Sequence, residues 1–429
     1  MSSLHDESVA LEHDKNDPLA EWRDYFYFPS RRSIGGSGDE PAVYLCGNSL
    51  GLQPRGVRER LAQELDDWAT YGVEGHFDAV TPWFSYHEIF RESAARLVGA
   101  QPGEAVLMNS LTVNLHLLMV SFYRPTKERY KILIEDSAFP SDRYAVQSQL
   151  EVHGFDPQTD MLVARPREGE TTLRTEDVLE LIEREGDQIA LVMFSGVNYF
   201  TGQAFDMKSI TAAGHAKGCR VGFDLAHAAG NLVLKLHDWD VDFAVWCNYK
   251  YLNSGPGAVA GAYVHERHGK NVSMPRFAGW WGNDPEQRFE VPDWFLAREG
   301  ADGWQLSNPP IFALAPVRAS LDLFDRVGMP ALRTKAEKLT GYLESLIDAL
   351  PTERYEIITP RTPADRGCQL SIRIREGART VLDALKRAGA ICDFRSPDVI
   401  RAAPVPLYNS YRDVWEFVQI LSQVDQELG

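Results

Sequence analysis

A single lysine, Lys250, interrupts the apolar run FAVWCNYKYLNSGPGAVAGAYV at residues 243–264. A free ammonium group inside a buried sheet costs several kcal/mol unless it is paired or chemically changed. Lys250 therefore either reaches solvent from the edge of the sheet or takes part in chemistry. A lysine amine can form a Schiff base with an aldehyde, and this removes the cost of burial because the nitrogen is no longer a free ammonium.

Polar and aromatic side chains follow three other apolar runs. Asp224 and His227 close the run CRVGFDLAH, Ser195 lies at the end of QIALVMFSG, and Phe139 and Asp142 come after RYKILIED. A pyridoxal phosphate ring needs a carboxylate opposite its nitrogen to keep the pyridinium protonated, and an aromatic face to stack on. The pattern therefore predicts a pyridoxal phosphate site with Asp224 at the ring nitrogen and Phe139 against the ring.

The phosphate of such a cofactor needs backbone N–H groups at the start of a helix. The stretch NSLTVNLHLLMVSFY meets this need, because Ser110 or Thr112 can cap a helix whose apolar residues follow at once. Each residue alone also has an ordinary interpretation: Thr112 as a plain helix cap, Phe139 as a core residue, and Asp224 with His227 as a hydrogen-bonded strand end. Only the combination supports the cofactor site.

Short apolar strands separated by helices must bring these residues together. The runs 129–136, 188–196, 219–227 and 241–249 lack polar alternation, and amphipathic stretches such as LRTEDVLELIEREG separate them. This order is typical of a mainly parallel sheet covered on both faces. Because ligands of such sheets bind outside the carboxyl ends of the strands, we expect an α/β protein with its site at that edge.

The chain divides into three predicted parts. Residues 1–40 end in the polar, glycine-rich RRSIGGSGDE and are expected to be a partly mobile N-terminal extension, with ordered structure beginning near residue 41. Residues 41–315 should form the large cofactor-binding domain, with an N-terminal segment packed on the small domain. Residues 316–429, with a long amphipathic helix and the runs GCQLSIRI and AICDFRSPDVIRAAPVPLYNS, should form a smaller α+β domain.

Composition excludes several classes of function. The 429-residue chain has a formal net charge of −17, which repels nucleic acid and anionic lipid, so we expect a small-molecule ligand and neither a nucleic-acid nor a membrane partner. Its five cysteines show no CxxC pairing, which argues against a disulfide framework or a thiolate zinc site and fits a reducing cytoplasm. HERH at 265–268 lacks the spacing of a zinc helix, so no metal is expected.

Long stretches of the sequence resemble the kynureninase family. They are YLCGNSLGLQP, LTVNLHLLMVSFYRPT, AFPSDRYAVQSQL, FSGVNYFTGQ, KGCRVGFDLAHAAGN, WCNYKYLNSGPG, SNPP and IRAAPVPLYNS, in this order from about residue 40 onward. The resemblance implies a pyridoxal phosphate (PLP) enzyme of fold type I, with a mainly parallel, mixed seven-stranded sheet in its large domain. It also implies hydrolytic Cβ–Cγ cleavage of L-kynurenine or 3-hydroxy-L-kynurenine to anthranilate or 3-hydroxyanthranilate and L-alanine, in tryptophan catabolism and NAD biosynthesis by the kynurenine pathway.

The resemblance also assigns site residues. Lys250 would hold the cofactor and carry protons, and Tyr249 beside it would polarise the substrate carbonyl or relay a proton; these are the catalytic residues. The implied cofactor-binding residues are Leu111, Thr112, Phe139, Ser141, Asp142, Ser195, Asp224, His227, Tyr249, Lys250, Trp280 and Asn308. The implied substrate contacts are Ser49, His76, Asn283, Ser307, Asn308 and Arg401.

Family enzymes are homodimers whose active sites are completed by the neighbouring subunit, so Trp280 and Asn308 would act across the interface. Arg401, just before an APVP turn, is suited to a bidentate grip on the substrate carboxylate, with a surface arginine as the alternative. Asn283 stands where family enzymes that prefer the hydroxylated substrate often have histidine, which leaves the substrate preference open with a slight lean toward 3-hydroxykynurenine.

Two other classes of protein stay open on the sequence alone. One is a different enzyme of the same fold, such as an aminotransferase or a cysteine desulfurase, although none of the five cysteines lies in an evident mobile loop. The other is a non-catalytic binding protein that has kept the fold, because a fold does not guarantee an activity.

Overall fold

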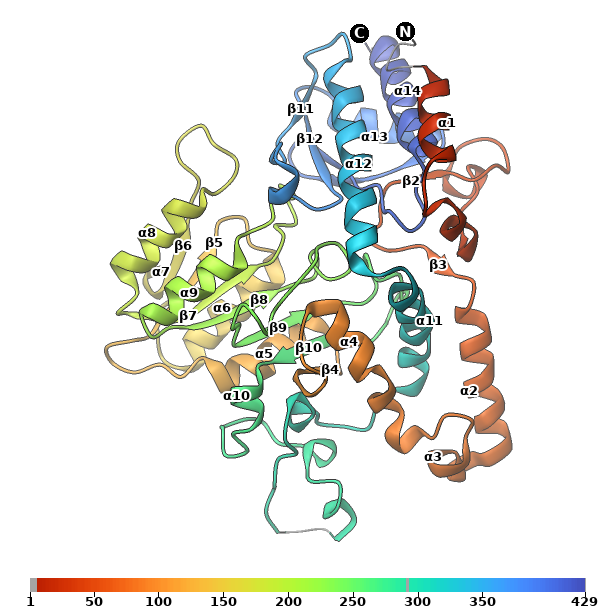
Figure 1. Cartoon of the computed structure of the whole chain (residues 1–429). Helices are drawn as coiled ribbons and strands as arrows, with labels where there is room; N and C mark the ends of the chain where they lie inside the picture. Colours follow the sequence, from red (N-terminus) through yellow and green to blue (C-terminus); the bar gives the residue numbers. More distant parts are fainter. Residues whose placement is uncertain (1–5, 291–292, 429) are drawn as a thin grey trace.

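A seven-stranded sheet forms the centre of the large domain in the computed structural model, which describes residues 6–290 and 293–428 (Figure 1). Strand β10 is antiparallel to both of its neighbours, β4 and β9, and the other pairings are parallel. This confirms the predicted mainly parallel, mixed sheet of seven strands. The strand order is β4 (Ala105–Leu107), β10 (Gly261–Val264), β9 (Phe243–Trp246), β8 (Arg220–Asp224), β7 (Ile189–Ser195), β5 (Lys131–Glu135) and β6 (Met161–Ala164).

Helices cover both faces of this sheet, which explains why the strands lack polar alternation. In β5, Ile132 and Ile134 pack in the core on one side and Leu133 packs in the core on the other. Every second side chain therefore enters a different apolar layer. Helices α5 (Leu111–Phe122) and α6 (Pro140–Val152) cover one face, whereas α8 (Thr175–Glu185), α9 (Met207–Ala216) and α4 (Arg91–Val98) pack on the other.

Strand β9 ends earlier than its apolar run. The indole of Trp246, the last residue of β9, donates a hydrogen bond to the side-chain oxygen of Asn248 at 3.1 Å, and the Asn248 amide donates to the carbonyl of Val259. The Ser254 N–H closes the turn by donating to the Asn248 carbonyl. Lys250 consequently lies in a turn beyond the carboxyl end of β9, which is the end of the strand at which the sequence predicted it.

The small domain is built on a four-stranded antiparallel sheet and lies at the top of Figure 1. Its helices share one apolar core with the sheet, and α14 packs against both α12 and α13. The strands in spatial order are β11 (Tyr355–Ile357), β12 (Leu370–Ile374), β15 (Val399–Ala402) and β14 (Asp393–Arg395), and the helices are α12 (Met329–Asp348), α13 (Ala378–Arg387) and α14 (Tyr411–Leu428).

The two cores divide within α12. Helix α11 (Ile311–Val327) packs on α2 (Val57–Tyr71) and belongs wholly to the large-domain core. Along α12, Ala336 still contributes to that core, whereas Leu339 contributes to the core of the small domain. The boundary expected at residue 316 is therefore too early, because α12 runs from one domain into the other as a single helix.

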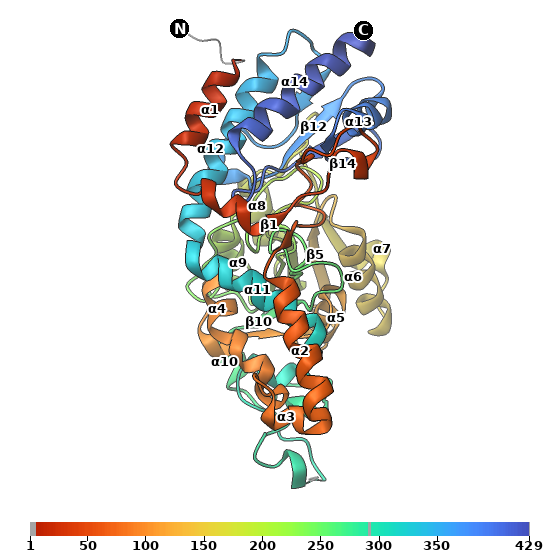
Figure 2. The same ribbon diagram turned by 90° about the vertical axis from the view of Figure 1, so that its right-hand side faces the viewer.

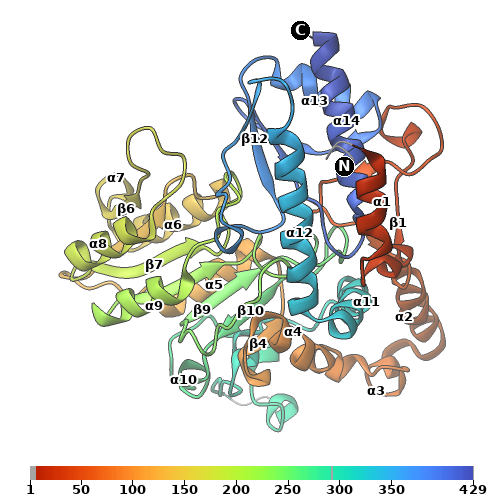
Figure 3. The same cartoon turned by 45° about the horizontal axis from the view of Figure 1, so that its top comes forward.

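Regular structure begins well before residue 41. Helix α1 (Glu7–Lys15) packs on α14, as Figures 1 and 3 show, and the carboxylate of Asp14 accepts hydrogen bonds from the backbone N–H groups of Tyr411 and Arg412. The expectation that order begins only near residue 41 is wrong for α1, because its buried face and this capping contact fix it to the small domain.

Shorter elements complete the described part of the chain. Strand β2 (Val43–Tyr44) pairs in parallel with β13 (Ala390–Ile391), which ties the N-terminal segment to the small domain. Among the described helices, none has the length and apolar composition needed to cross a membrane. Further short elements are β1 (Phe26–Tyr27) paired with β3 (Gln53–Pro54), α3 (Gly75–Asp78), α7 (Pro157–Asp160) and α10 (Glu266–Gly269).

Candidate active site

A pocket opens at the carboxyl ends of β7, β8 and β9, beside the first residues of α5 and α6. This is the edge of the sheet at which the strand-end residues were expected to meet. The structure brings together ten of the predicted cofactor-binding residues here and adds three that were not predicted. The lining residues are Leu111, Thr112, Phe139, Ser141, Asp142, Ser195, Val197, Tyr199, Asp224, Ala226, His227, Tyr249 and Lys250.

The amine of Lys250 lies near three other side chains of the pocket. Its Nζ atom is 3.1 Å from Nε2 of His227, 5.7 Å from the centroid of the Phe139 ring and 5.8 Å from that of Tyr249. Burial lowers the pKa of His227 well below its usual range, and the charge of Lys250 lowers it further. The imidazole is therefore neutral, and it can exchange a hydrogen bond with the lysine amine without carrying charge.

Three buried carboxyl groups lie in or next to the pocket, those of Asp142, Asp224 and Glu135. Burial raises the pKa of Asp142 well above its usual value, and the neighbouring Asp224 raises it further. Burial also raises the pKa of Asp224, although the hydrogen bond from Asp142 and the charge of Lys250 oppose the effect. Burial raises the pKa of Glu135 to about 7. Because three buried carboxylates beside one another repel, the cofactor-free site holds at least one proton among them.

Glu135 is a buried acid that the sequence analysis missed. It is the last residue of β5, and its carboxylate accepts hydrogen bonds from the backbone N–H of Ser195 and, at 2.6 Å, from the Ser195 hydroxyl. The Ser195 hydroxyl therefore turns its hydrogen away from the pocket and presents lone pairs to it. The rule that located Asp224 at the end of its strand would have located Glu135 as well.

The residues of this pocket fit PLP on structural grounds. Asp142 Oδ1 and His227 Nδ1 are buried and have no hydrogen-bond partner among the described residues, so both are free for a ligand. The side chain of Ser110 makes no capping bond at the start of α5, where Leu111 and Thr112 line the pocket and can present backbone N–H groups to a phosphate. An amine, an acid, an aromatic face and an anion site thus line a single pocket.

Several predicted residues lie away from this pocket within one chain. His76 is in α3, where its Nδ1 atom contacts the carbonyl of Val73 at 2.9 Å. Trp280 and Asn283 line a separate pocket together with Phe295, and the Asn283 side chain accepts a hydrogen bond from a backbone N–H of its own loop. Asn283 is 6% exposed, so its amide is engaged in holding that loop.

Of the other predicted substrate contacts, two lie on the surface of the chain and two lie near the Lys250 pocket. Ser307 and Asn308 are exposed on the surface of the chain and do not line the Lys250 pocket. Ser49 lies near the Lys250 turn, because the N–H of Gly51 donates to the carbonyl of Tyr249. Arg401 is only 1% exposed, so the alternative of a surface arginine is wrong.

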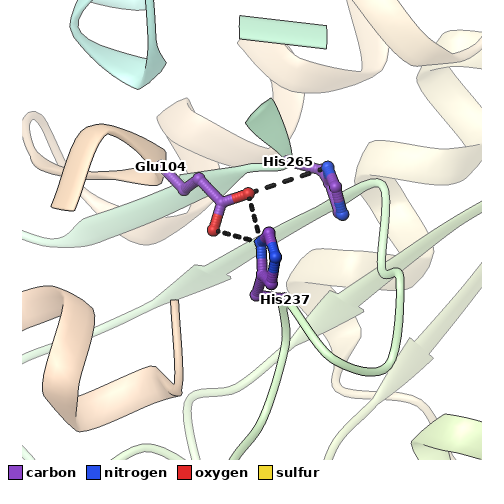
Figure 4. A group of neighbouring side chains, drawn as sticks. All are labelled: Glu104, His237 and His265. Carbon is purple, nitrogen blue, oxygen red and sulfur yellow. Dashed lines mark hydrogen bonds and ion pairs between the residues drawn. The ribbon is translucent and has the colours of Figure 1, made fainter. Parts of the chain in front are cut away.

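Figure 4 shows a second cluster, formed by Glu104, His237 and His265. His265 directly follows β10, which is antiparallel to β9, so the cluster lies at the edge of the sheet opposite the carboxyl end of β9. Its carboxylate already accepts hydrogen bonds from His237 and from the backbone N–H groups of Gln101 and Glu266, and the bond with Glu104 raises the pKa of His237. The two imidazole rings are stacked, with centroids 5.0 Å apart and planes 18° apart. We interpret the cluster as a hydrogen-bond network that joins these segments, and we assign no ion to it.

Comparison with solved structures defines the class of fold. The chain superimposes on the cysteine desulfurase CsdA from Escherichia coli with a TM-score of 0.75 at 16% identity, covering 95% of this chain and 98% of that one. A C-DES mutant with glycine covalently linked to its PLP cofactor gives a TM-score of 0.74 at 18% identity, covering 89% and 96%. The predicted fold type I of PLP-dependent enzymes is confirmed.

Comparison with curated proteins defines the family. The chain is 60% identical over 415 residues to the kynureninase of Myxococcus xanthus (strain DK1622), covering 97% of this chain and 96% of the relative. It is 59% identical to that of Koribacter versatilis (strain Ellin345), covering 96% of each, and 51% identical to that of Nematostella vectensis, covering 95% and 92%. Residues 332–421 match the kynureninase C-terminal domain. This chain belongs to the kynureninase family, as its sequence motifs predicted.

Proposed function

We propose that this protein hydrolyses the Cβ–Cγ bond of L-kynurenine or 3-hydroxy-L-kynurenine, giving L-alanine and anthranilate or 3-hydroxyanthranilate. The observation that carries the proposal is the pocket in which Lys250, Asp224 and Phe139 meet beside the start of α5. Its residue types fit PLP, and relatives of nearly equal length and about 60% identity are named kynureninase.

When bound, PLP supplies an aldehyde that captures an amine and a ring that accepts electrons from the bond that breaks. Asp224 would hold the ring nitrogen protonated, and Phe139 would stack on the ring. With a substrate bound, the Lys250 amine would take the α-proton and later return it to the reacting molecule, with neutral His227 beside it. Positioned proton transfer of this kind contributes roughly 10²- to 10⁴-fold to a rate.

Tyr249 is the residue best suited to act on the substrate carbonyl. Burial raises the pKa of its hydroxyl, so the phenol stays protonated at neutral pH and can donate a hydrogen bond. Such a donor stabilises the charge that develops on the ketone oxygen when water adds to that carbon. The carbon–carbon bond then breaks, the aromatic acid leaves, and protonation of the remaining three-carbon unit yields alanine.

The thiols of this chain are not suited to cysteine desulfurase chemistry. That reaction needs an accessible nucleophilic cysteine, since the thiolate is the reactive form. All five cysteines are buried and free, and burial raises the pKa of Cys46 to about 12. Such thiols are inert, which separates this chain from the desulfurases that share its fold. The same free thiols support a cytoplasmic location as part of the proposal.

We also propose a homodimer whose active sites combine residues of two chains. Helix α2 carries an apolar stripe that faces solvent in the single chain, with Leu65 and Trp68 more than half exposed. Figures 1 and 2 show the far end of α2, α3 and the segment after α10 in the lower part of the molecule, away from the small domain. Exposed aromatic residues there include Phe77 in α3 and Trp294. An apolar surface of this kind marks a protein interface.

A dimer also accounts for the predicted residues that lie away from the pocket. His76, Trp280 and Asn308 do not line the Lys250 pocket of their own chain. His76 belongs to α3 and Trp280 to the segment after α10, and both of these carry the exposed aromatic residues described above. A second chain docked there can bring these residues to the pocket of its partner.

Steady-state assays of the purified holoprotein with both substrates test the proposed function. We expect formation of anthranilate from kynurenine and of 3-hydroxyanthranilate from 3-hydroxykynurenine, each with one equivalent of alanine, and a modest preference for the hydroxylated substrate. Absence of both aromatic products from a protein that binds PLP would contradict the proposal. Release of sulfide from cysteine would favour the desulfurase alternative.

A further inference from the structure

The small domain presents two arginines and one carboxylate on a single face of its sheet. Asp393 of β14 lies directly opposite Arg401 of β15 in the antiparallel register, so their side chains share a face. Arg395 lies two residues beyond Asp393 on the same strand and therefore shares that face as well. The alternate residues Phe394 and Ile400 pack with the small-domain core.

This face is directed at the large domain and the Lys250 pocket. Nη1 of Arg401 donates a hydrogen bond to the carbonyl of Tyr199 at 2.7 Å, and the Arg401 guanidinium lies 5.9 Å from the centroid of the Tyr199 ring. Tyr199 lines the pocket and packs edge-to-face on Phe139, with ring centroids 5.2 Å apart. Arg401 therefore lies directly behind a wall of the pocket.

Asp393 bonds to both arginines. Nε of Arg401 donates to Asp393 Oδ1 at 2.6 Å, and Nη2 of Arg401 bonds to Oδ2. Nη2 of Arg395 lies 3.2 Å from the same Oδ2 atom. All three nitrogens of the Arg401 guanidinium thus have partners within the protein, and its bidentate edge formed by Nε and Nη2 is already occupied by a carboxylate.

The charges of Arg401, Asp393 and Arg395 indicate which of these residues can bind an anion. Arg401 and Asp393 neutralise each other, so the pair alone offers a substrate carboxylate no net charge. Arg395 adds one positive charge that no described carboxylate other than Asp393 balances. Its Nε atom is buried without a hydrogen-bond partner among the described residues, and about a third of its side chain is exposed. The charges of Arg401 and Arg395 also add to burial in lowering the pKa of His227 in the pocket.

We infer that Arg395 is a second arginine that binds the α-carboxylate of the amino-acid substrate, while Asp393 holds both guanidinium groups in place. The inference rests on the proposed function only in requiring an α-amino acid as the ligand. Because Asp393 occupies the space between the two guanidinium groups, the substrate carboxylate would lie beside Arg395, where it would accept the unpartnered N–H of Arg395 and balance its positive charge. Charge-assisted hydrogen bonds of this kind are the strong ones in proteins.

Two small probes that differ only in the carboxylate test the inference on the holoenzyme. L-Alanine carries the α-carboxylate and ethylamine lacks it; binding of either is followed by the change in absorbance of the bound cofactor. We expect Arg395→Gln to raise the Kd for L-alanine by roughly 10- to 150-fold, the loss of one charged hydrogen-bonding partner. The Kd for ethylamine should stay within about twofold.

Two further variants make the result specific. Arg395→Lys keeps the charge and should recover part of the affinity for L-alanine. Arg375→Gln removes the same charge from an exposed position of the small domain, where it pairs with the exposed Glu353, and should bind both probes as the parent does. Thermal unfolding of each variant shows that the fold is intact.

The inference is overturned if Arg395→Gln binds L-alanine as tightly as the parent protein. It is equally overturned if the variant loses affinity for both probes to the same degree, because a purely structural role predicts that pattern. Failure of the proposed function has a different signature: the parent holoenzyme would bind L-alanine more tightly than ethylamine and still release no aromatic acid from either kynurenine.

Discussion

The amine of Lys250 lies 3.1 Å from Nε2 of His227, and both side chains line the same pocket. Burial keeps His227 neutral. The lysine amine therefore faces a neutral hydrogen-bonding partner, which leaves it available for a covalent bond to an aldehyde. Asp142 and Asp224 line the same pocket, and a buried acid of this kind can act on a ring nitrogen.

The first prediction concerns the covalent link to the cofactor. Replacing Lys250 by Ala should abolish turnover and the covalent attachment of PLP, because Lys250 is the only lysine among the described residues that line the pocket. Borohydride reduction of the parent holoprotein, followed by peptide mapping, should place the label on Lys250 alone. A label on any other lysine, or normal turnover by the Lys250→Ala variant, would refute the assignment.

A second prediction concerns the acid at the ring nitrogen. Asp224→Ala should weaken PLP binding by about 1.5–3 kcal/mol, which is the worth of a hydrogen bond to a charged group. The measurement is the Kd for PLP from a titration of the cofactor-free protein. Asp348→Asn removes a carboxylate at an exposed position of the small domain and should leave the Kd unchanged. Equal affinities in the Asp224→Ala and parent proteins would show that this acid does not contact the cofactor.

A third prediction follows from the buried Glu135. In the folded protein burial raises its pKa to about 7, whereas its ordinary value is 4.5. Between these two pH values the folded state binds more protons than the unfolded state, so the free energy of unfolding falls as the pH rises. The contribution of this group is up to about 3 kcal/mol.

Glu135→Gln isolates this contribution, because glutamine keeps the size and hydrogen-bonding capacity of the side chain without titrating. Denaturant unfolding of the cofactor-free protein at pH 5 and pH 7.5 measures the effect. The parent should lose more stability than the variant over this interval. Identical pH profiles for the two proteins would mean that Glu135 is ionised throughout.

A fourth prediction tests the shared active site. Lys250→Ala and Trp280→Ala should each be inactive or strongly impaired as separate homodimers. When the two variants are mixed and allowed to exchange subunits, each mixed dimer contains one site with a native Lys250 from one chain and a native Trp280 from the other. Activity should therefore reappear in the mixture. If mixing restores nothing although mixed dimers form, Trp280 acts within its own chain or not at all.

The position of the cofactor site could be predicted from the sequence because its residues directly follow strands that are visible as apolar runs. Asp224 and Ser195 follow directly from strands that the apolar runs mark, and parallel strands present their carboxyl ends at one edge whatever the details of packing. Lys250 was identified for the same reason, although the turn that carries it depends on the hydrogen bonds of Asn248, which no periodicity reveals.

Other features depended on contacts between distant segments. Helix α1 is fixed by hydrogen bonds that the backbone N–H groups of Tyr411 and Arg412 donate to the Asp14 carboxylate. Helix α12 passes from one core to the next without a break in its sequence pattern. Arg401 and Asp393 are brought together by the register of β14 and β15. Such pairings join residues that no local pattern connects.

The sequence by itself determined the α/β class, the family and the set of residue types that can hold PLP, because these follow from strand periodicity and from motifs that are continuous along the chain. The tertiary structure alone decided which acids share a proton, where the chain changes domain, and how the charge of Arg401 is balanced. Those properties depend on burial and on distances between side chains from separate elements, and both are set only when the chain has folded.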